Sequence, residues 1–79
     1  MPYNEKILKS LKFCLFKLDI ALSYHKAEFK TGGNTTKTDL DLLKKLRKKV
    51  LLALKSENFT PEQTYKIYQS IRYCNLIAW

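Results

Sequence analysis

The chain has 79 residues, enough for one small domain and too few for two separate cores. Hydrophobic residues make up 46% of the sequence, which excludes wholesale disorder, and the absence of any run of about 18 apolar residues predicts no membrane-spanning helix. Fifteen basic residues against seven acidic ones give a net charge of +8. The chain has only 2 Gly and 2 Pro but 13 Leu and 13 Lys, a composition that favours helices over a turn-rich β structure.

The first predicted helix runs from about residue 4 to residue 29, with Asn4 as its N-cap. Its seam is formed by residues that alternate in spacing between three and four: Leu8, Leu11, Leu15, Leu18, Leu22, His25 and Phe29. Phe13, Phe16 and Ile20 widen the apolar surface near the middle of the helix. We therefore expect this helix to contact more than one neighbour.

A polar segment at 30–38, which contains Gly32 and Gly33, is predicted to be a flexible loop before a second helix over 39–57. Thr38 and Asp41 have the spacing of a capping box at the start of that helix. One stripe of the helix is apolar and is predicted to face the core: Leu42, Leu43, Leu46, Val50, Ala53 and Leu54. Lysines cover the opposite arc.

The third helix is predicted to begin with Thr60 as N-cap, Pro61 in the first turn and Gln63 bonding back to the cap, and to run to Trp79. Its inward face is predicted to carry five side chains: Ile67, Tyr68, Ile71, Cys74 and Ala78. Further apolar residues lie on the other side of the same helix, so we expect a second apolar face there.

Together these elements predict a single all-α domain, a three-helix antiparallel bundle with up-down-up order. At 1.5 Å per residue the first helix would be about 39 Å long and the other two about 28 Å, which leaves part of the first helix uncovered. A domain this small is also thinly stable alone. We therefore expect a partner to complete the core, either a second copy or a different protein.

The first residues, 1–6, lack the basic start, apolar stretch and cleavage site of a signal peptide, so a cytoplasmic protein is expected. Cys14 and Cys74 are far apart in sequence and His25 stands alone, which gives none of the ligand spacings of a zinc site. Cys14 and Cys74 lie at positions along the parallel first and third helices that agree within about one turn. The two cysteines are therefore predicted to be neighbouring thiols that stay reduced in the cytosol.

The titratable residues favour a protein without catalytic activity, cofactor or metal. His25 has no Ser or Cys at a spacing that would make it a catalytic base, so we interpret it as a structural residue of the seam. Asp39 and Asp41 suit the positive end of a helix dipole better than acid–base chemistry. The Gly32-Gly33 pair lacks the lysine and the flanking strand of a phosphate-binding loop.

The second helix concentrates cations that are predicted to form one strip along its exposed face: Lys44, Lys45, Arg47, Lys48, Lys49 and Lys55. Such a strip follows phosphates through counterion release, and Tyr65, Tyr73 and Trp79 offer rings for exposed bases. The sequence therefore predicts nucleic-acid binding, with RNA favoured. The alternatives are a face that only confers solubility, or a membrane-surface anchor at Leu52, a single leucine too small for stable insertion.

Residues 39–79 contain the pair Leu46-Arg47, then the run Phe59 to Gln63 and a closing segment that ends in tryptophan. In this order they resemble the last helical hairpin of the S23-type four-helix-bundle family. That family includes the accessory variability determinants of diversity-generating retroelements, basic oligomers that associate with a reverse transcriptase and its RNA. The resemblance implies an accessory protein of a ribonucleoprotein. The glycine-bearing segment of the family is replaced here by residues 73–76, so contacts made through it are not carried over.

The same Phe59 to Gln63 start of the last helix also resembles the immunity proteins of pediocin-like bacteriocins, which are small, basic, cytoplasmic helical bundles. This resemblance implies a second function, a protein-binding inhibitor or immunity protein that acts through its C-terminal helix. The residues predicted to bind the protein partner are those of the outer side of that helix: Tyr65, Arg72, Tyr73, Leu76, Ile77 and Trp79.

Overall fold

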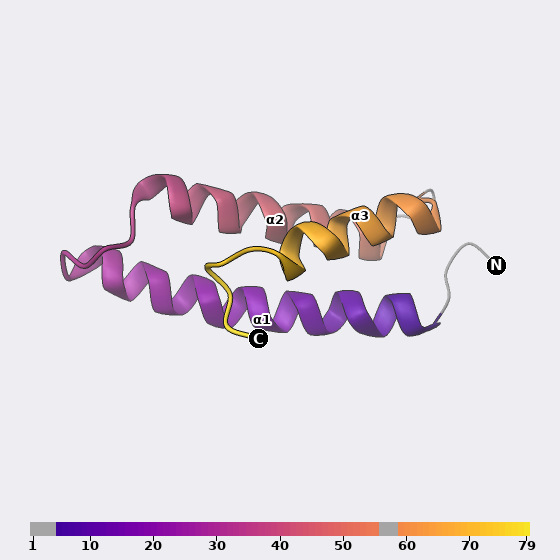
Figure 1. The fold of residues 1–79 in the computed structure, drawn as a ribbon, viewed down its shortest axis with the longest axis horizontal. Coiled ribbons are helices and arrows are strands. Elements are labelled where there is room, and N and C mark those ends of the chain that lie inside the picture. Colours follow the sequence, from indigo (N-terminus) through magenta and orange to yellow (C-terminus); the bar gives the residue numbers. More distant parts are fainter. Residues whose placement is uncertain (1–4, 56–58) are drawn as a thin grey trace.

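The computed structural model describes residues 5–55 and 59–79. It contains three helices, α1 (Glu5–Lys30), α2 (Lys37–Lys55) and α3 (Pro61–Arg72), and no strand within those residues. In Figure 1, α2 runs antiparallel to α1 and α3 returns in the direction of α1. The predicted all-α, up-down-up arrangement of three packed helices is confirmed.

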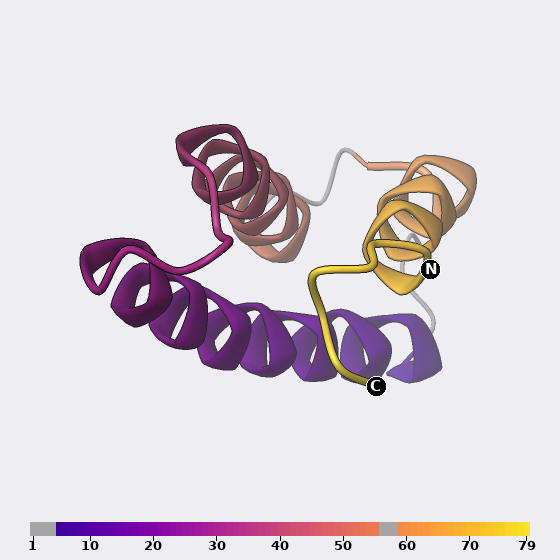
Figure 2. The same cartoon turned by 60° about the vertical axis from the view of Figure 1, so that its left-hand side comes forward.

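The helices form two layers, with α2 and α3 together on one side of α1 (Figure 2). The core between the layers contains residues from all three helices and from the segment after α3: Leu11, Cys14, Leu18, Ala21, Leu22, Leu43, Leu46, Val50, Ala53, Ile71 and Ile77. The positions predicted to face the core are mostly buried or half-buried, but two of those predictions are wrong, because Leu42 is 44% exposed and Ala78 is exposed. Phe29, the last seam position of α1, is 46% exposed because it lies at the end of the helix.

Two glycines end α1, each for a different reason. Gly32 has a φ of +78°, which glycine adopts without the steric cost that a side chain would bring. Gly33 donates its N–H to the carbonyl of Glu28 at 2.8 Å, and a Cβ at this position would collide with the Glu28 side chain. The loop therefore leaves the helix at the position that the sequence predicts.

The start of α2 differs from the prediction. The capping box is formed by Thr36 and Asp39, whose N–H groups bond to each other's side-chain oxygens at 3.1 and 3.2 Å. The helix consequently begins at Lys37, and the predicted box of Thr38 and Asp41 is wrong by two residues. Asn4 and the predicted end of this helix at 57 lie outside the described residues.

The start of α3 is as predicted, because Thr60 and Gln63 form a reciprocal capping box and Pro61 occupies the first turn. Its end is not: the helix stops at Arg72, and residues 73–79 turn back toward α1 (Figure 2). There Ile77 enters the core, and the carbonyl of Leu76 bonds to the Nε2 of His25 at 2.9 Å. Burial of Ile77 and this hydrogen bond replace the last two helical turns, so the predicted second apolar face of a helix to 79 does not exist.

Both cysteines are free thiols. Cys14 is fully buried in the core, and burial raises the pKa of its thiol, an effect that the charge of Arg72 partly opposes. Cys74 is half-buried and packs against the same core. A buried thiol with a raised pKa carries little thiolate at neutral pH and reacts slowly, so Cys14 is a packing residue.

Candidate nucleic-acid interface

Helical geometry divides the lysines of α2 between two sides of the helix. Lys45 and Lys49 are one turn apart and line a groove toward α3, whereas Lys44 lines a hollow toward α1. Lys48 and Lys55 are exposed, and Leu52 lies among the lysines with half of its surface exposed, as the sequence predicts. The predicted single strip is therefore two cationic edges rather than one continuous surface.

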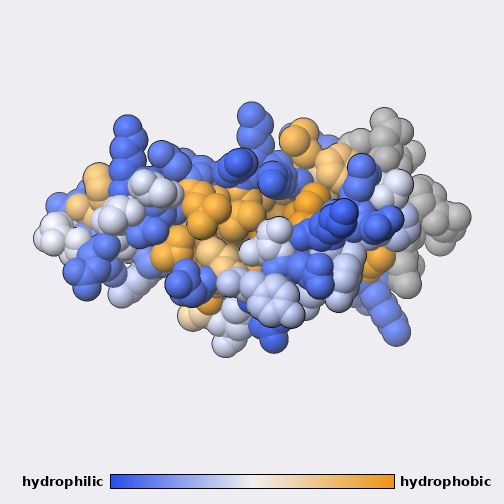
Figure 3. Space-filling model, turned by 45° about the horizontal axis from the view of Figure 1, so that its top comes forward, coloured by the Kyte–Doolittle hydropathy of each residue, from blue (hydrophilic) through white to orange (hydrophobic). Residues whose placement is uncertain are grey.

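The groove on the α3 side, which we term the α2–α3 groove, has a volume of about 500 Å³. Its walls come from α2 and from the end of α3 with the turn that follows: Leu42, Lys45, Leu46, Lys49, Ser70, Tyr73, Cys74 and Asn75. On the face that carries these two helices, Figure 3 shows hydrophobic surface along the middle with hydrophilic side chains on either side. The groove thus joins an apolar floor to a cationic edge.

Tyr73 is the most exposed large hydrophobic residue of this groove, with 82% of its surface accessible. Its backbone is fixed at the C-cap of α3, where its N–H bonds to the carbonyl of Gln69 at 3.0 Å. Across the groove, Lys45 and Lys49 have no carboxylate within ion-pair distance among the described residues. An open ring with a fixed backbone therefore lies in the same groove as two ammonium groups that no carboxylate neutralises.

Arg47 is held differently from the lysines around it. Its Nε donates to Oδ1 of Asp19 on α1 at 2.7 Å, and both side chains are about half exposed, at 41% and 51%. They lie in the hollow on the α1 side of α2, together with Lys26 and Lys44. Because one edge of the guanidinium already binds a carboxylate, Arg47 is less able to grip a phosphate than the sequence predicts.

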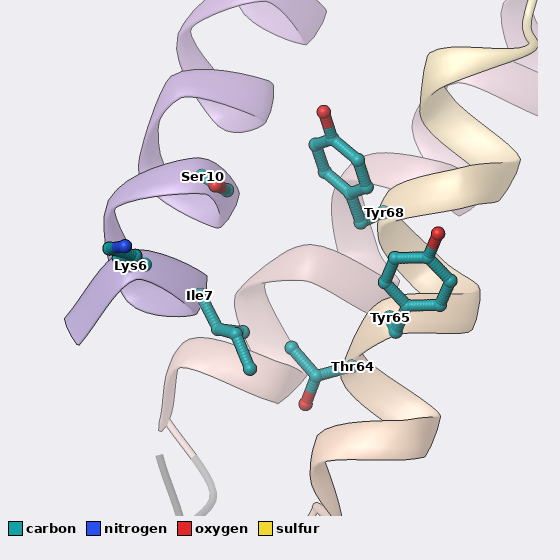
Figure 4. Close-up of a pocket in the computed structure, with 6 residues that line it drawn as sticks. All are labelled: Lys6, Ile7, Ser10, Thr64, Tyr65 and Tyr68. Carbon is teal, nitrogen blue, oxygen red and sulfur yellow. The ribbon is translucent and has the colours of Figure 1, made fainter. Parts of the chain in front are cut away.

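The other two rings predicted to stack on bases lie away from the groove. Tyr65 stacks on Tyr68, with ring centroids 6.3 Å apart, beside a pocket of about 240 Å³ between the start of α1 and α3 (Figure 4). Trp79 packs on Phe13 of α1 at a centroid distance of 6.0 Å, and the guanidinium of Arg72 lies 4.9 Å from the indole. Of the three predicted rings, only Tyr73 lines the α2–α3 groove.

The residues predicted to bind a protein partner also lie in different parts of the structure. Ile77 is only 5% exposed and belongs to the core, and Leu76 is half-buried against it. Tyr65 lines the pocket near the start of α1, Tyr73 lines the α2–α3 groove, and Trp79 lies on α1. These residues therefore do not form one continuous face, because the helix that would have aligned them ends at Arg72.

His25 connects the two segments that cover the far end of α1. Its Nδ1 lies 2.8 Å from the hydroxyl of Thr35 in the loop, and its Nε2 lies 2.9 Å from the carbonyl of Leu76. Since a carbonyl only accepts, Nε2 carries the proton. Next to this pair, hydrogen bonds from the Tyr24 hydroxyl and the Asn34 N–H lower the pKa of Glu28, and the same carboxylate raises the pKa of Tyr24. His25 has a structural part in this network.

Among the described residues, no group of three or more His, Cys, Asp or Glu side chains is placed to hold a metal ion. No helix in that part of the chain is both long and apolar enough to cross a membrane. Comparison with protein-family models, with curated proteins and with solved structures finds no match to this chain.

Proposed function

We propose that this protein binds single-stranded RNA, without catalysis, through the α2–α3 groove. The observation that carries the proposal is the joint position in one groove of the open Tyr73 ring and the ammonium groups of Lys45 and Lys49, which form no ion pair within residues 5–55 and 59–79. Aromatic rings beside a cationic groove are the usual elements of single-strand recognition, because bases stack on the ring while the backbone follows the charges.

Each wall of the groove supplies one part of this recognition. On the α2 wall, the ammonium groups would neutralise successive phosphates and release counterions. On the opposite wall, Tyr73 would stack with one base, and the hydroxyl of Ser70 and the amide of Asn75 offer hydrogen bonds to base edges or ribose. The volume of about 500 Å³ lies within the range of about 300–1,000 Å³ that is typical of ligand sites.

Long-range electrostatics supports the same partner. The net charge of +8 attracts polyanions, and Lys44 and Lys48 add to the field from outside the groove. Their role would be to increase the rate of encounter rather than to contact the bound strand. The accessory proteins of ribonucleoproteins that residues 39–79 resemble would share this type of partner.

The test compares two pairs of lysines that differ only in the side of α2 on which they lie. Lys45→Gln with Lys49→Gln removes the groove charges, whereas Lys44→Gln with Lys48→Gln removes the same charge elsewhere. For a labelled single-stranded RNA, the slope of log affinity against log salt should flatten by about 1.4 for the groove pair, at about 0.7 for each lost phosphate contact, and by much less for the control pair. Fluorescence anisotropy between about 0.05 and 0.2 M salt measures both slopes.

Tyr73 provides an independent readout. Tyr73→Ala should weaken binding by about 1–3 kcal/mol without changing the salt slope, and Tyr73→Phe should restore it, because stacking needs the ring and not the hydroxyl. Equal slopes for the two lysine pairs would contradict the groove as the site. If the wild-type protein binds no RNA at about 0.1 M salt, the lysines only confer solubility and the protein-binding function predicted from the sequence takes precedence.

A further inference from the structure

A row of large apolar side chains covers the side of α1 that faces away from α2 and α3. The row, which we term the α1 stripe, comprises Phe13, Phe16, Ile20 and Tyr24. These residues are between 51% and 63% exposed, and their spacing of three, four and four places them on one helical face. The core-facing residues Leu11 and Leu18 lie on the opposite side of the same helix, so the stripe contributes little to the fold.

The segment after α3 extends this surface. Trp79 packs on Phe13 with ring centroids 6.0 Å apart, and Phe13 lies 6.5 Å from Phe16, so three rings form a continuous aromatic cluster. Beside it, Ile20 and Tyr24 border a mostly apolar hollow of about 440 Å³ that the returning segment closes. Apolar surface of this kind on a small protein marks an interaction site.

Positive charge lies along the N-terminal half of the α1 stripe. Lys9 and Lys12 are exposed near its N-terminal end, and the ammonium of Lys17 lies 5.9 Å from the centre of the Phe13 ring. The nearby carboxylates are engaged within the protein, since Asp19 pairs with Arg47 and Glu28 accepts a hydrogen bond from Tyr24. The surface that a partner meets is therefore aromatic in the middle and cationic at the rim.

We propose that the α1 stripe docks this protein reversibly on an anionic lipid surface. Aromatic side chains enter the boundary between headgroups and acyl chains, while lysines reach the phosphates beside it. The cationic rim complements such a surface and disfavours a second copy, because two chains of +8 would bring like charges together. In the docked orientation α2 and α3 lie on the far side of α1 (Figure 2), so the α2–α3 groove stays in water.

Trp79 is the single tryptophan of the chain, and it lies at the edge of the surface in question, so it reports docking directly. Titration with vesicles of equal parts phosphatidylcholine and phosphatidylglycerol should shift its emission to shorter wavelength, and brominated acyl chains should quench it. With vesicles of phosphatidylcholine alone, binding should be at least about tenfold weaker, given about 1 kcal/mol for each lysine near an anionic surface.

Matched variants distinguish binding through the α1 stripe from nonspecific hydrophobic binding. Ile20→Ser and Leu52→Ser remove aliphatic side chains of equal exposure, 51% and 50%, from α1 and α2 respectively. Partition to anionic vesicles should fall about fivefold for Ile20→Ser and about thirtyfold when Phe16→Ser is added, but should not change for Leu52→Ser. Lys9→Gln with Lys12→Gln should weaken it by about fivefold for each lysine. Circular dichroism verifies that each variant is folded.

Three results would overturn the proposal. Equal binding to neutral and anionic vesicles would remove the role of the lysine rim, and equal loss for Ile20→Ser and Leu52→Ser would remove the role of the α1 stripe. Sedimentation that shows a dimer which Phe16→Ser with Ile20→Ser converts to monomer would assign the α1 stripe to a second copy of the chain instead.

Discussion

The two long helices bury similar seams but present different faces to solvent. On α2 the exposed residues are mostly lysines, divided between the two edges of the helix, with Leu42 and Leu52 as the exposed large apolar residues. On α1 the outer face carries the α1 stripe, with lysines only at its margin. Since both helices pack inward through leucine, the difference is not a requirement of the fold.

This contrast bears on how each proposed site is argued. A lysine face is compatible with water alone, so α2 needs additional features, such as Tyr73 across the α2–α3 groove, before a ligand is implied. An aromatic face is costly in water, which is why the α1 stripe is proposed as a docking surface. If the outer faces are independent of the fold, substitutions on them should leave stability nearly unchanged, and the ion pair of Arg47 with Asp19 should contribute little.

The largest difference in stability is expected between a substitution on the buried face of α1 and one on its exposed face. Leu18→Ala removes a side chain that is fully buried, so it should lower the free energy of unfolding by about 2–5 kcal/mol. Phe16→Ser removes a larger side chain that is 60% exposed, and the change should stay within about 0.5 kcal/mol. Urea denaturation followed by circular dichroism measures both. A comparable loss for Phe16→Ser would mean that the outer face supports the fold.

A smaller effect is expected at the contact between α1 and α2. Arg47→Gln removes an ion pair that is about half exposed and part of the packing of the arginine stem, so it should cost about 1 kcal/mol or less. Lys48→Gln, one position along the same helix, should cost nothing measurable because its side chain is exposed and unpaired. A double-mutant cycle with Asp19→Asn isolates the pair; zero coupling would leave only the stem of Arg47 to explain the loss.

The smallest effect is a pH dependence at the end of the α1 stripe. Hydrogen bonding to Tyr24 lowers the pKa of Glu28 from its ordinary value of 4.5, so the stabilisation is present above that value and is lost as the pH falls below it. Because the pKa of Tyr24 is raised above its ordinary value of 10.0, the hydroxyl stays protonated at that pH, and its ionisation breaks the bond only in more alkaline solution. Thermal unfolding of Tyr24→Phe should therefore approach that of the wild type at acid pH; a constant difference from pH 3 to 7 would contradict the bond.

The sequence predicts the helices well where local chemistry decides them. Thr60, Pro61 and Gln63 define a helix start without help from the rest of the chain, and the structure contains the same capping box. The end of α3 is different, because residues 73–79 have helical periodicity and contain neither Gly nor Pro. Only the distant His25 and the core site for Ile77 turn the chain there, and neither is visible in the local sequence.

The same limit applies to the candidate site. Periodicity identifies Lys45 and Lys49 as exposed, but it does not show which side of α2 packs near α3 or that Tyr73 will lie opposite. That pairing depends on how α2 and α3 pack and on the end of α3 at Arg72. The apolar residues Phe13, Phe16 and Ile20 are conspicuous in the sequence, yet only the position of the two other helices shows that they stay uncovered.

The two glycines at the end of α1 set different rules for how this protein can evolve. Position 32 needs a left-handed backbone, which asparagine also tolerates, and the space around it is open. A side chain at position 33 would occupy the space that the Glu28 side chain already fills. It would therefore have to displace the Glu28 carboxylate from its hydrogen bond with Tyr24. The residues at positions 28 and 33 should therefore covary among homologues, whereas the residue at position 32 should vary independently of both. Homologues that keep the glutamate beside a larger residue at 33 would contradict this coupling.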